Sequence, residues 1–387
     1  MIKSILSILL FVFFASGSQT GSISGYVCDD RGNPLAGATV ILKGTVYGAM
    51  TDTNGEYLII NLGTETYSLE VSRRGYDTAT VEGIRVTENQ TTTCDFVLSK
   101  SPVEVHEWGA VTFTQESVIF GADPEMDPSS EAIATDQQTE PLARAPVVYF
   151  YGNPFSGVFT VTVKSGSFIE LYPEPDTIVY TSNLPEYPSG NASWNITSAL
   201  HIPPAPRTMI GMLSTPSFYS CIFPEQINLW RQPPSMHLHL SDGYAEKFIY
   251  YECRLNSQSD STYYPVLMTD DGPTLDPEWD GQMFRAVRTE DSVIVELVSL
   301  ESTGAVEATE IPEIFYDWAG GYMNSEELQS MWETWEDWVL GGEWSGDTLI
   351  VFPLPDSTVE AISSISLETD NDIPVEYSRF FLGLFSK

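Results

Sequence analysis

The chain has 387 residues, 42% of them hydrophobic, and this length favours two domains with cores of useful size. It carries 17 Lys and Arg against 54 Asp and Glu, for a formal net charge of −37. That charge disfavours binding to nucleic acid and to anionic lipid headgroups. Most of the acidic excess follows residue 100, where 10 basic residues face 44 acidic ones. Solubility in an extracellular setting is its simplest interpretation, ahead of a dedicated cation-binding surface.

The N-terminus has the pattern of a secretory signal peptide. Lys3 precedes an apolar run over residues 5–14, and small residues follow at 15–18. The run is too short to cross a bilayer, which takes about 20 helical residues, and no later stretch approaches that length. We therefore expect residues 1–18 to be removed, and the mature protein to be extracellular or periplasmic with no membrane span.

Four cysteines, an even number in an exported chain, fall two per predicted domain at Cys28, Cys94, Cys221 and Cys253. Disulfides within each domain are one interpretation, and free or half-paired thiols are the other. Cys94 is in phase with the apolar Phe96 and Leu98, whereas Cys28 is out of phase with Val27. The pairing therefore stays open.

Residues 21–99 alternate short apolar strands with turn signals such as DDRGNP at 29–34 and DTNG at 52–55. This spacing predicts a small β-sandwich. The strings SGYV (24–27), GNPLAGA (32–38), TDTNGEY (51–57), GY (75–76) and DFVL (95–98) resemble the carboxypeptidase regulatory-like domain. That resemblance implies a transthyretin-like sandwich over residues 19–100, an accessory module without catalytic residues.

After a linker at 100–102, residues 103–387 again show mainly period-two alternation, which predicts a larger β-rich domain of unknown function. One long amphipathic helix interrupts it. Asn324 and Glu327 form a capping-box pattern, and Gly341 and Gly342 end the helix. Its apolar residues recur at intervals of three and four: Leu328, Met331, Trp332, Trp335, Trp338 and Val339. This spacing favours packing of three indoles onto a sheet over a ligand-stacking role.

The same region is similar to a group of uncharacterised exported bacterial proteins that share a HEWG-type motif. The strings that carry the resemblance are HEWG (106–109), APVVYFY (145–151), EKFIYY (246–251) and the helix over 326–338. The chain departs from the group at Ala110, where threonine is usual, and at Glu252 and Cys253, which replace a basic residue and glycine. The resemblance implies a domain over residues 103–387 and no particular activity.

The sequence lacks a Gly-x-Ser-x-Gly elbow, a His-Glu-x-x-His helix, a phosphate-binding loop and a placed dinucleotide fingerprint. Common hydrolase and nucleotide chemistries are therefore disfavoured. Cys221 or Cys253 paired with a histidine would be a nucleophile, but exported cysteines more often pair or pack.

Three adjacent residues, His106, Glu107 and Trp108, are the candidate ligand-binding residues. On a strand, His106 and Glu107 point to opposite faces, so only one of them can face a given site. The alternatives are a polar and aromatic lip for a ligand, or a buried histidine and tryptophan that fix the first strand of the sheet.

His237 and His239 are the candidate metal ligands, since on a strand they share one face while Met236, Leu238 and Leu240 take the other. Zinc needs a third ligand, for which we consider His106, His201, Glu107 and Asp242. Alternatively, the two histidines line the polar face of a half-exposed strand. Calcium-type oxygen ligands also gather at Asp270, Asp271, Asp276, Glu278 and Asp280, but their spacing matches no EF-hand and favours a solvated turn.

From these patterns we expect an exported, non-enzymatic binding or surface-associated protein. Carbohydrate is the candidate ligand because aromatic side chains suit sugar rings and the second domain holds all nine tryptophans. The expected partners are cell-surface or extracellular polysaccharide or protein. A metal-dependent extracellular hydrolase using His237 and His239 is the alternative, and no cofactor is assigned.

Overall fold

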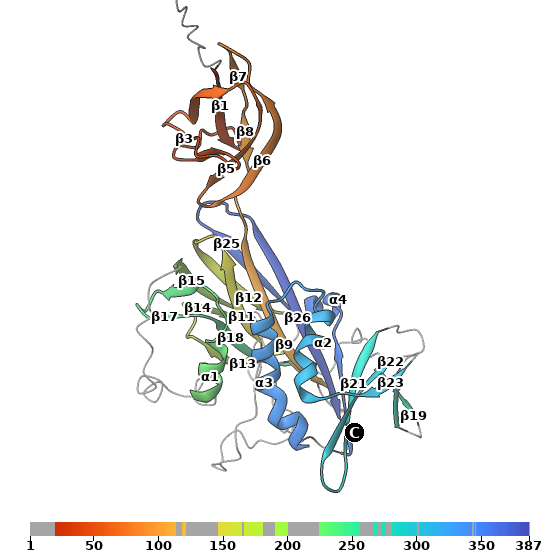
Figure 1. The fold of residues 1–387 in the computed structure, drawn as a ribbon. Helices are drawn as coiled ribbons and strands as arrows, with labels where there is room; N and C mark the ends of the chain where they lie inside the picture. The colour runs from red at the N-terminus through yellow and green to blue at the C-terminus, as the bar shows by residue number, and fades with distance from the viewer. Residues whose placement is uncertain are drawn as a thin grey trace, which may run out of the picture. The chain divides into compact units, whose positions relative to one another are not determined.

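The computed structural model describes residues 20–113, 118–120, 146–164, 166–180, 190–199, 224–255, 266–269, 272–275, 281–299, 302–342, 344 and 346–386. The chain divides into two compact units, Met1–Ser101 and Pro102–Lys387. Strands dominate both units, so the architecture is mostly β, as the alternation predicts (Figure 1).

The first unit is a β-sandwich of two four-stranded sheets. Their orders are β4-β1-β7, with β8 also paired to β1, and β3-β2-β5-β6. Alternate apolar side chains from both sheets fill one core, for example Ile23, Val40 and Leu69. The strands are β1 Thr20–Asp29, β2 Thr39–Leu42, β3 Gly48–Met50, β4 Glu56–Gly63, β5 Thr66–Arg73, β6 Tyr76–Arg85, β7 Thr91–Thr93 and β8 Phe96–Leu98.

The second unit contains a ten-stranded sheet of order β10-β18-β11-β9-β26-β24-β21-β22-β23, with β13 also paired to β18. At its centre β9 and β26 run parallel over eleven residue pairs, from Val103 opposite Val375 to Phe113 opposite Phe385. Its strands are β9 Val103–Phe113, β10 Val118–Phe120, β11 Val147–Gly152, β13 Gly166–Tyr172, β18 Ile249–Leu255, β21 Gln282–Arg288, β22 Val293–Ser299, β23 Thr303–Ala305, β24 Thr348–Pro353 and β26 Val375–Ser386.

A six-stranded sheet covers one face of the ten-stranded sheet. Its order is β17-β16-β15-β12-β25, with β14 paired to β15. Its strands are β12 Ser156–Val163, β14 Thr177–Tyr180, β15 Gly190–Ala199, β16 His237–Leu240, β17 Ala245–Glu246 and β25 Ser363–Thr369, and a separate hairpin joins β19 Val266–Thr269 to β20 Gly272–Leu275. Apolar residues of the two facing sheets, such as Phe150 and Trp194, form a continuous core between them.

Helices cover the other face of the ten-stranded sheet (Figure 1). They are α1 Pro224–Trp230, α2 Ile311–Trp318, which follows the 3-10 turn η3 Ala308–Glu310, and α3 Ser325–Gly341; a further helix, α4 Asp356–Ile362, precedes β25. The second unit therefore has three layers with two cores, one between the sheets and one beneath the helices.

Helix α3 matches the predicted long helix. Asn324 and Glu327 form the capping box, and Gly342 ends the helix in the left-handed conformation at φ +70°. All six predicted apolar residues are buried, the three indoles among them, which confirms the packing interpretation. Helices α1, α2 and α4 were not predicted, because each has only seven or eight residues and too few turns for a clear period.

Candidate functional site

Strand β9 places the three candidate ligand-binding residues in the middle of the ten-stranded sheet. His106 lies between Tyr149 and Ser378, Glu107 between Val148 and Arg379, and Trp108 between Val147 and Phe380. The exposed fractions of the three residues are 4%, 0% and 0%. Period two sends Glu107 toward the core between the sheets, and His106 and Trp108 toward the core beneath the helices.

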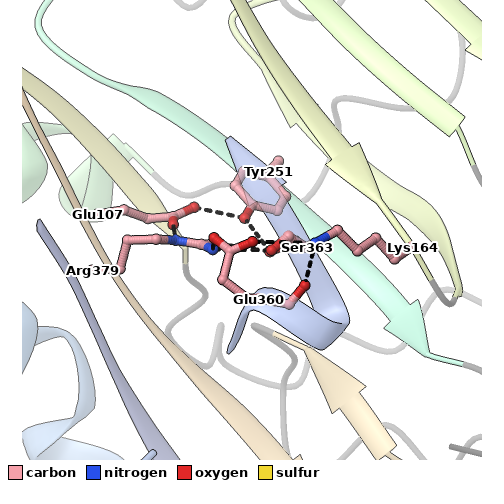
Figure 2. Close-up of polar contacts among 6 residues, drawn as sticks. All are labelled: Glu107, Lys164, Tyr251, Glu360, Ser363 and Arg379. Atoms are coloured by element: carbon pink, nitrogen blue, oxygen red, sulfur yellow. Dashed lines mark hydrogen bonds and ion pairs between the residues drawn. The ribbon is translucent and has the colours of Figure 1, made fainter. Parts of the chain in front are cut away.

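Glu107 is held by a buried network that links the two sheets (Figure 2). Its Oε2 accepts a hydrogen bond from Arg379 Nε at 2.5 Å, and its Oε1 accepts one from Tyr251 Oη at 2.6 Å. Arg379 also donates from Nη2 to Ser363 Oγ at 2.9 Å and from Nη1 to the Ser363 carbonyl at 2.9 Å. Both carboxylate oxygens of Glu107 are therefore satisfied by side chains of the protein.

This network continues outward to the surface. Arg379 Nη1 donates to Glu360 Oε1 at 2.8 Å, and Lys164 Nζ donates to Glu360 Oε2 at 3.1 Å. The carboxylate of Glu360 is half exposed, whereas Arg379 is largely buried. Figure 2 shows the resulting row of alternating charges, from Lys164 through Glu360 and Arg379 to Glu107.

The electrostatics of the network favour a permanently charged guanidinium and a neutral phenol. Burial, the largest single effect, opposes the charge on Arg379, but Glu107, Tyr251 and Glu360 together outweigh it, so the pKa of Arg379 is raised above its ordinary value. Burial, reinforced by the charge of Glu107, raises the pKa of Tyr251 well above its ordinary value. Neither group can exchange protons near neutral pH, and this arrangement suits structure better than acid–base chemistry.

On the opposite face of β9, His106 is paired with a buried carboxylate from α3. Its Nδ1 lies 3.0 Å from Glu327 Oε2, and the same oxygen accepts the backbone N–H of Asn324 at 3.0 Å. The Glu327 that completes the helix cap therefore also fixes the imidazole. The ring of Tyr151 packs against His106 with centroids 4.8 Å apart.

This second group is less completely satisfied than the first. Glu327 Oε1 and Tyr151 Oη are both buried and make no hydrogen bond of acceptable geometry within the described part of the chain. The two groups nevertheless interact: burial and then the charge of Glu327 raise the pKa of Tyr151. Trp108 lies deeper in the same core, edge-on to Trp230 with centroids 6.5 Å apart.

The structure thus separates the predicted ligand-binding residues onto two faces, each packed against side chains of the protein. His106 and Trp108 share one face and Glu107 takes the other, as period two predicts. A ligand role for His106, Glu107 and Trp108 stays a prediction, and their present contacts fit the alternative interpretation of buried residues that fix the strand.

The candidate metal ligands His237 and His239 lie on β16, opposite Ala199 and Thr197 of β15. Met236, Leu238 and Leu240 contact the core between the sheets, so the two histidines take the outer face as predicted. Within the described residues, no group of three His, Cys, Asp or Glu side chains is placed to hold a metal. His201 and the acidic cluster Asp270, Asp271, Asp276, Glu278 and Asp280 lie outside the described residues, so the metal site stays a prediction.

Cys28, Cys94 and Cys253 are free thiols, and Cys221 lies outside the described residues. The disulfide interpretation is therefore wrong for the first unit. The reason is register along β1: Cys28 lies beside Val97, whereas the backbone of Cys94 bonds to Ser24. Four residues of extended strand, about 13 Å, separate those two positions.

Sequence reasoning missed a cluster of exposed aromatic side chains over the last turn of α2 and the residues that follow it, 316–322, which we call the aromatic turn. Tyr322 is 75% exposed and Tyr316 is 41% exposed. Trp318 alone among the tryptophans of the described ranges is not buried. Its Nε1 donates to Gln282 Oε1 at 3.2 Å, and its ring packs 4.9 Å from Phe284.

Two glycines shape the aromatic turn. Gly320 and Gly321 have φ of +64° and +72°, a region that disfavours other residues. A Cβ on Gly320 would lie 3.0 Å from the Tyr322 ring, and one on Gly321 would lie 3.5 Å from Tyr316 Oη. The two tyrosines thus border the glycines on either side. The sequence signal was present in the string YDWAGGY, which joins three aromatic residues to a glycine pair.

Comparison with known proteins supports the identity of the first unit. Residues 22–99, about one fifth of the chain, match the profile described as "Carboxypeptidase regulatory-like domain". This match confirms the resemblance of the N-terminal domain. No curated protein matches the chain. In the described residues, no helix is both long and apolar enough to cross a membrane.

Several solved structures also show similarity. A chain of a type II cohesin–X–dockerin complex from Acetivibrio cellulolyticus is 24% identical over 21% of this chain and 58% of its own length, with a TM-score of 0.19. A candidate carbohydrate-binding protein from Bacteroides uniformis is 10% identical over 45% of this chain and 78% of its own, with a TM-score of 0.19. The major pilin SpaD from Corynebacterium diphtheriae is 12% identical over 74% and 63%, with a TM-score of 0.20. Scores this low carry no argument about function.

Proposed function

We propose that the protein is an exported binding or surface-associated protein that recognises carbohydrate through the aromatic turn. The observation that carries the proposal is the gathering of Tyr316, Trp318 and Tyr322 at one glycine-shaped turn, with their rings partly exposed. The nine tryptophans of the second domain are what first indicated carbohydrate. The proposal instead relies on the position of one of them, because the other described tryptophans are buried.

The chemistry of the turn suits a sugar. The C–H face of a sugar ring stacks on an aromatic ring, while its hydroxyl groups need polar partners. Asp317 is exposed beside Trp318, and Gln282 fixes the indole through its side-chain oxygen. Packing of the indole against Phe284 holds the ring in place before any ligand arrives, which lowers the entropic cost of binding.

A glycan array probed with the mature protein, residues 19–387, tests this proposal. Glycans that bind are then titrated against the wild type and the variants Trp318→Ala and Tyr322→Ala. We expect each variant to weaken binding about tenfold, since a well-stacked aromatic contact contributes about 1 kcal/mol beyond its buried area. The variant Tyr244→Ala is the matched control, because Tyr244 is 44% exposed, close to the value for Tyr316, but lies in another turn.

Absence of glycan binding, or binding that is unaffected by Trp318→Ala, would contradict the proposal. A peptide array run in parallel covers the possibility that the surface partner is a protein. Saturable hydrolysis of an array substrate, without binding, would place the protein among enzymes instead.

In this proposal the signal peptide at residues 1–18 directs export, and the sandwich at 19–100 acts as an accessory module. Residues 103–387, which resemble the HEWG-type group, carry the ligand site. Mass measurement of protein recovered outside the cytoplasm tests the first point, and the expected N-terminus is near Gln19. Recovery of the uncleaved chain from the cytoplasm would contradict export.

The alternative function is metal-dependent extracellular hydrolysis at His237 and His239. One observation favours it: His239 Nε2 is buried and has no hydrogen-bond partner in the part of the chain that the structure describes. Metal analysis of untagged protein, repeated on the His237→Ala/His239→Ala variant, tests it. A wild type without stoichiometric zinc, copper or iron, and with a melting temperature that ignores added metal, would remove this alternative.

A further inference from the structure

A groove with a volume of about 430 Å³ lies between the last strand of the ten-stranded sheet and helix α2; we call it the β23 groove. Strand β23 and the residues flanking it, 302–306, form one side. The other side is formed by Glu310, Glu313, Ile314 and Asp317, which recur along one face of α2 and the turn before it. No basic residue lines the groove.

Strand β23 ends the sheet within the described residues, so one edge of its backbone has no strand beside it. Ser302 and Val306 point their backbone groups inward, toward β22. The carbonyl of Ser302 accepts the N–H of Ser299, and the N–H of Val306 donates to the carbonyl of Val295. Alternation of the antiparallel ladder then turns the N–H and C=O groups of Thr303 and Ala305 outward. These groups form a template for another extended chain.

The side chains of β23 leave this edge accessible. Thr303, Gly304 and Ala305 are small and exposed, and none carries the charge or proline that usually protects an edge strand. A Cβ added to Gly304 would meet no atom within 4 Å. The face of β23 at Gly304 is therefore open, and a larger side chain there would enter the groove.

The wall of the groove sets the chemistry of the occupant. Glu313 and Asp317 are exposed and form no ion pair with any residue that the structure describes, whereas Glu310 accepts the backbone N–H of Glu307 through Oε2. Side chains of an extended peptide alternate between faces, so every second residue would face α2. Cationic side chains at those positions complement the carboxylates.

We propose that the β23 groove binds an extended peptide segment of a protein partner, which adds as a strand to β23 and carries Lys or Arg at alternate positions. This peptide site adjoins the aromatic turn, since Asp317 borders both, but it uses the edge of β23 and not the exposed aromatic rings. Main-chain pairing supplies affinity, and the acidic wall selects basic sequences.

Fluorescence anisotropy with synthetic seven-residue peptides tests the proposal. The probe alternates lysine with threonine, and its matched control has the same sequence with an N-methyl group on every backbone amide, so that neither edge of the peptide can donate. Both peptides carry the same charge, but only the probe can pair with the strand edge. We expect N-methylation to weaken binding about tenfold or more, since it removes two or more hydrogen bonds.

Variants of the protein separate pairing from charge. Thr303→Pro removes the outward-pointing backbone N–H of residue 303 without removing a hydrogen bond to β22. Gly304→Leu places a large side chain in the groove. We expect each variant to weaken peptide binding about tenfold. Glu313→Gln/Asp317→Asn should weaken it about fivefold. The matched control Glu326→Gln/Glu333→Gln on α3 removes the same charge elsewhere and should have no effect.

Equal binding of the two peptides, or equal weakening by the control variant, would overturn the proposal, because adhesion to the acidic domain would then explain the result. Absence of binding to the probe would overturn it too. Gly304→Leu should leave glycan binding unchanged, and Trp318→Ala should leave peptide binding unchanged. Failure of this proposal and failure of the carbohydrate proposal are thus distinguishable.

Discussion

The two faces of β9 each bury a carboxylate, but the two are satisfied to different degrees. Between the sheets, Glu107 uses both oxygens, one for Arg379 and one for Tyr251. Beneath the helices, Glu327 uses Oε2 for His106 and for the N–H of Asn324, while Oε1 makes no hydrogen bond of acceptable geometry among the described atoms. Both carboxylates have an exposed fraction of 0%.

The difference lies in the partners that the two sites provide. A guanidinium brings several donors in a rigid fork and a permanent charge, so it can satisfy a carboxylate and bond other groups as well. An imidazole brings one donor to the carboxylate, and the remaining support comes from the N-terminus of α3, where the helix dipole favours a negative group. The face with Arg379 should therefore be the more sensitive to mutation.

The largest expected effect is the loss of Arg379. Arg379→Met would leave Glu107 buried without a counter-charge, and we expect it to lower the free energy of unfolding by about 3–5 kcal/mol. Urea unfolding followed by tryptophan fluorescence is the measurement. All nine tryptophans follow residue 100, so the signal reports the second unit alone.

A paired substitution provides the control for that experiment. Glu107→Leu/Arg379→Met removes both charges, and an apolar replacement of a buried ion pair often costs little. We expect the double variant to recover most of the lost stability. A double variant as unstable as Arg379→Met would mean that the packing of Arg379, and not its charge, stabilises the fold.

A smaller loss is expected on the other face. Glu327→Leu removes the acceptor for His106 Nδ1 and for the N–H of Asn324, and we expect a loss of about 2 kcal/mol. Glu327→Gln keeps an acceptor oxygen and should lose about half as much. Circular dichroism checks whether α3 persists. A loss for Glu327→Leu that exceeds the loss for Arg379→Met would reverse the ranking of the two faces.

The sequence predicted the local parts of this arrangement. Period two placed His106 and Glu107 on opposite faces, and the capping pattern placed Asn324 and Glu327 at the start of α3. The link between Glu107 and Arg379 could not be predicted, because 272 residues separate them. They become neighbours only through the parallel pairing of β9 and β26, which leaves no local signal in either strand.

Strand β6 and the aromatic turn also left too little local signal to be predicted from the sequence. Strand β6 was not predicted because most of its residues are exposed and show no apolar alternation. The aromatic turn was missed because it becomes a candidate site only if its aromatic rings are exposed. That exposure depends on how the short helix α2 packs. Turn chemistry at Gly320 and Gly321 was readable, but the position of the Trp318 ring beside Gln282 and Phe284 depends on β21.

Alkaline pH tests whether both faces keep their phenols neutral. Burial raises the pKa of Tyr251 on one face and of Tyr149 on the other well above the ordinary value of 10.0. The folded state therefore holds these protons after the unfolded chain has released them. Stability is fully present below pH 10 and falls above it, by about 1 kcal/mol per pH unit for each of the two phenols.

The measurement is the free energy of unfolding at several pH values from neutral to alkaline. The variant Tyr251→Phe should reduce the slope of the free energy of unfolding against pH above pH 10 by the contribution of one phenol. At lower pH the free energy of unfolding should stay independent of pH. An unchanged slope in this variant would show that Tyr251 ionises in the folded protein.

The smallest expected effect separates the two faces through a single hydroxyl on each. Tyr251 Oη donates to Glu107, so Tyr251→Phe leaves a buried carboxylate oxygen unsatisfied and should cost about 1–2 kcal/mol at neutral pH. Tyr151 Oη has no hydrogen bond of acceptable geometry in the described residues, so Tyr151→Phe should change the free energy of unfolding by less than about 0.5 kcal/mol. The two substitutions remove the same atom, and urea unfolding compares them directly. A cost for Tyr151→Phe equal to that for Tyr251→Phe would mean that Tyr151 bonds to Glu327 Oε1 in solution. The face beneath the helices would then be as fully satisfied as the face between the sheets.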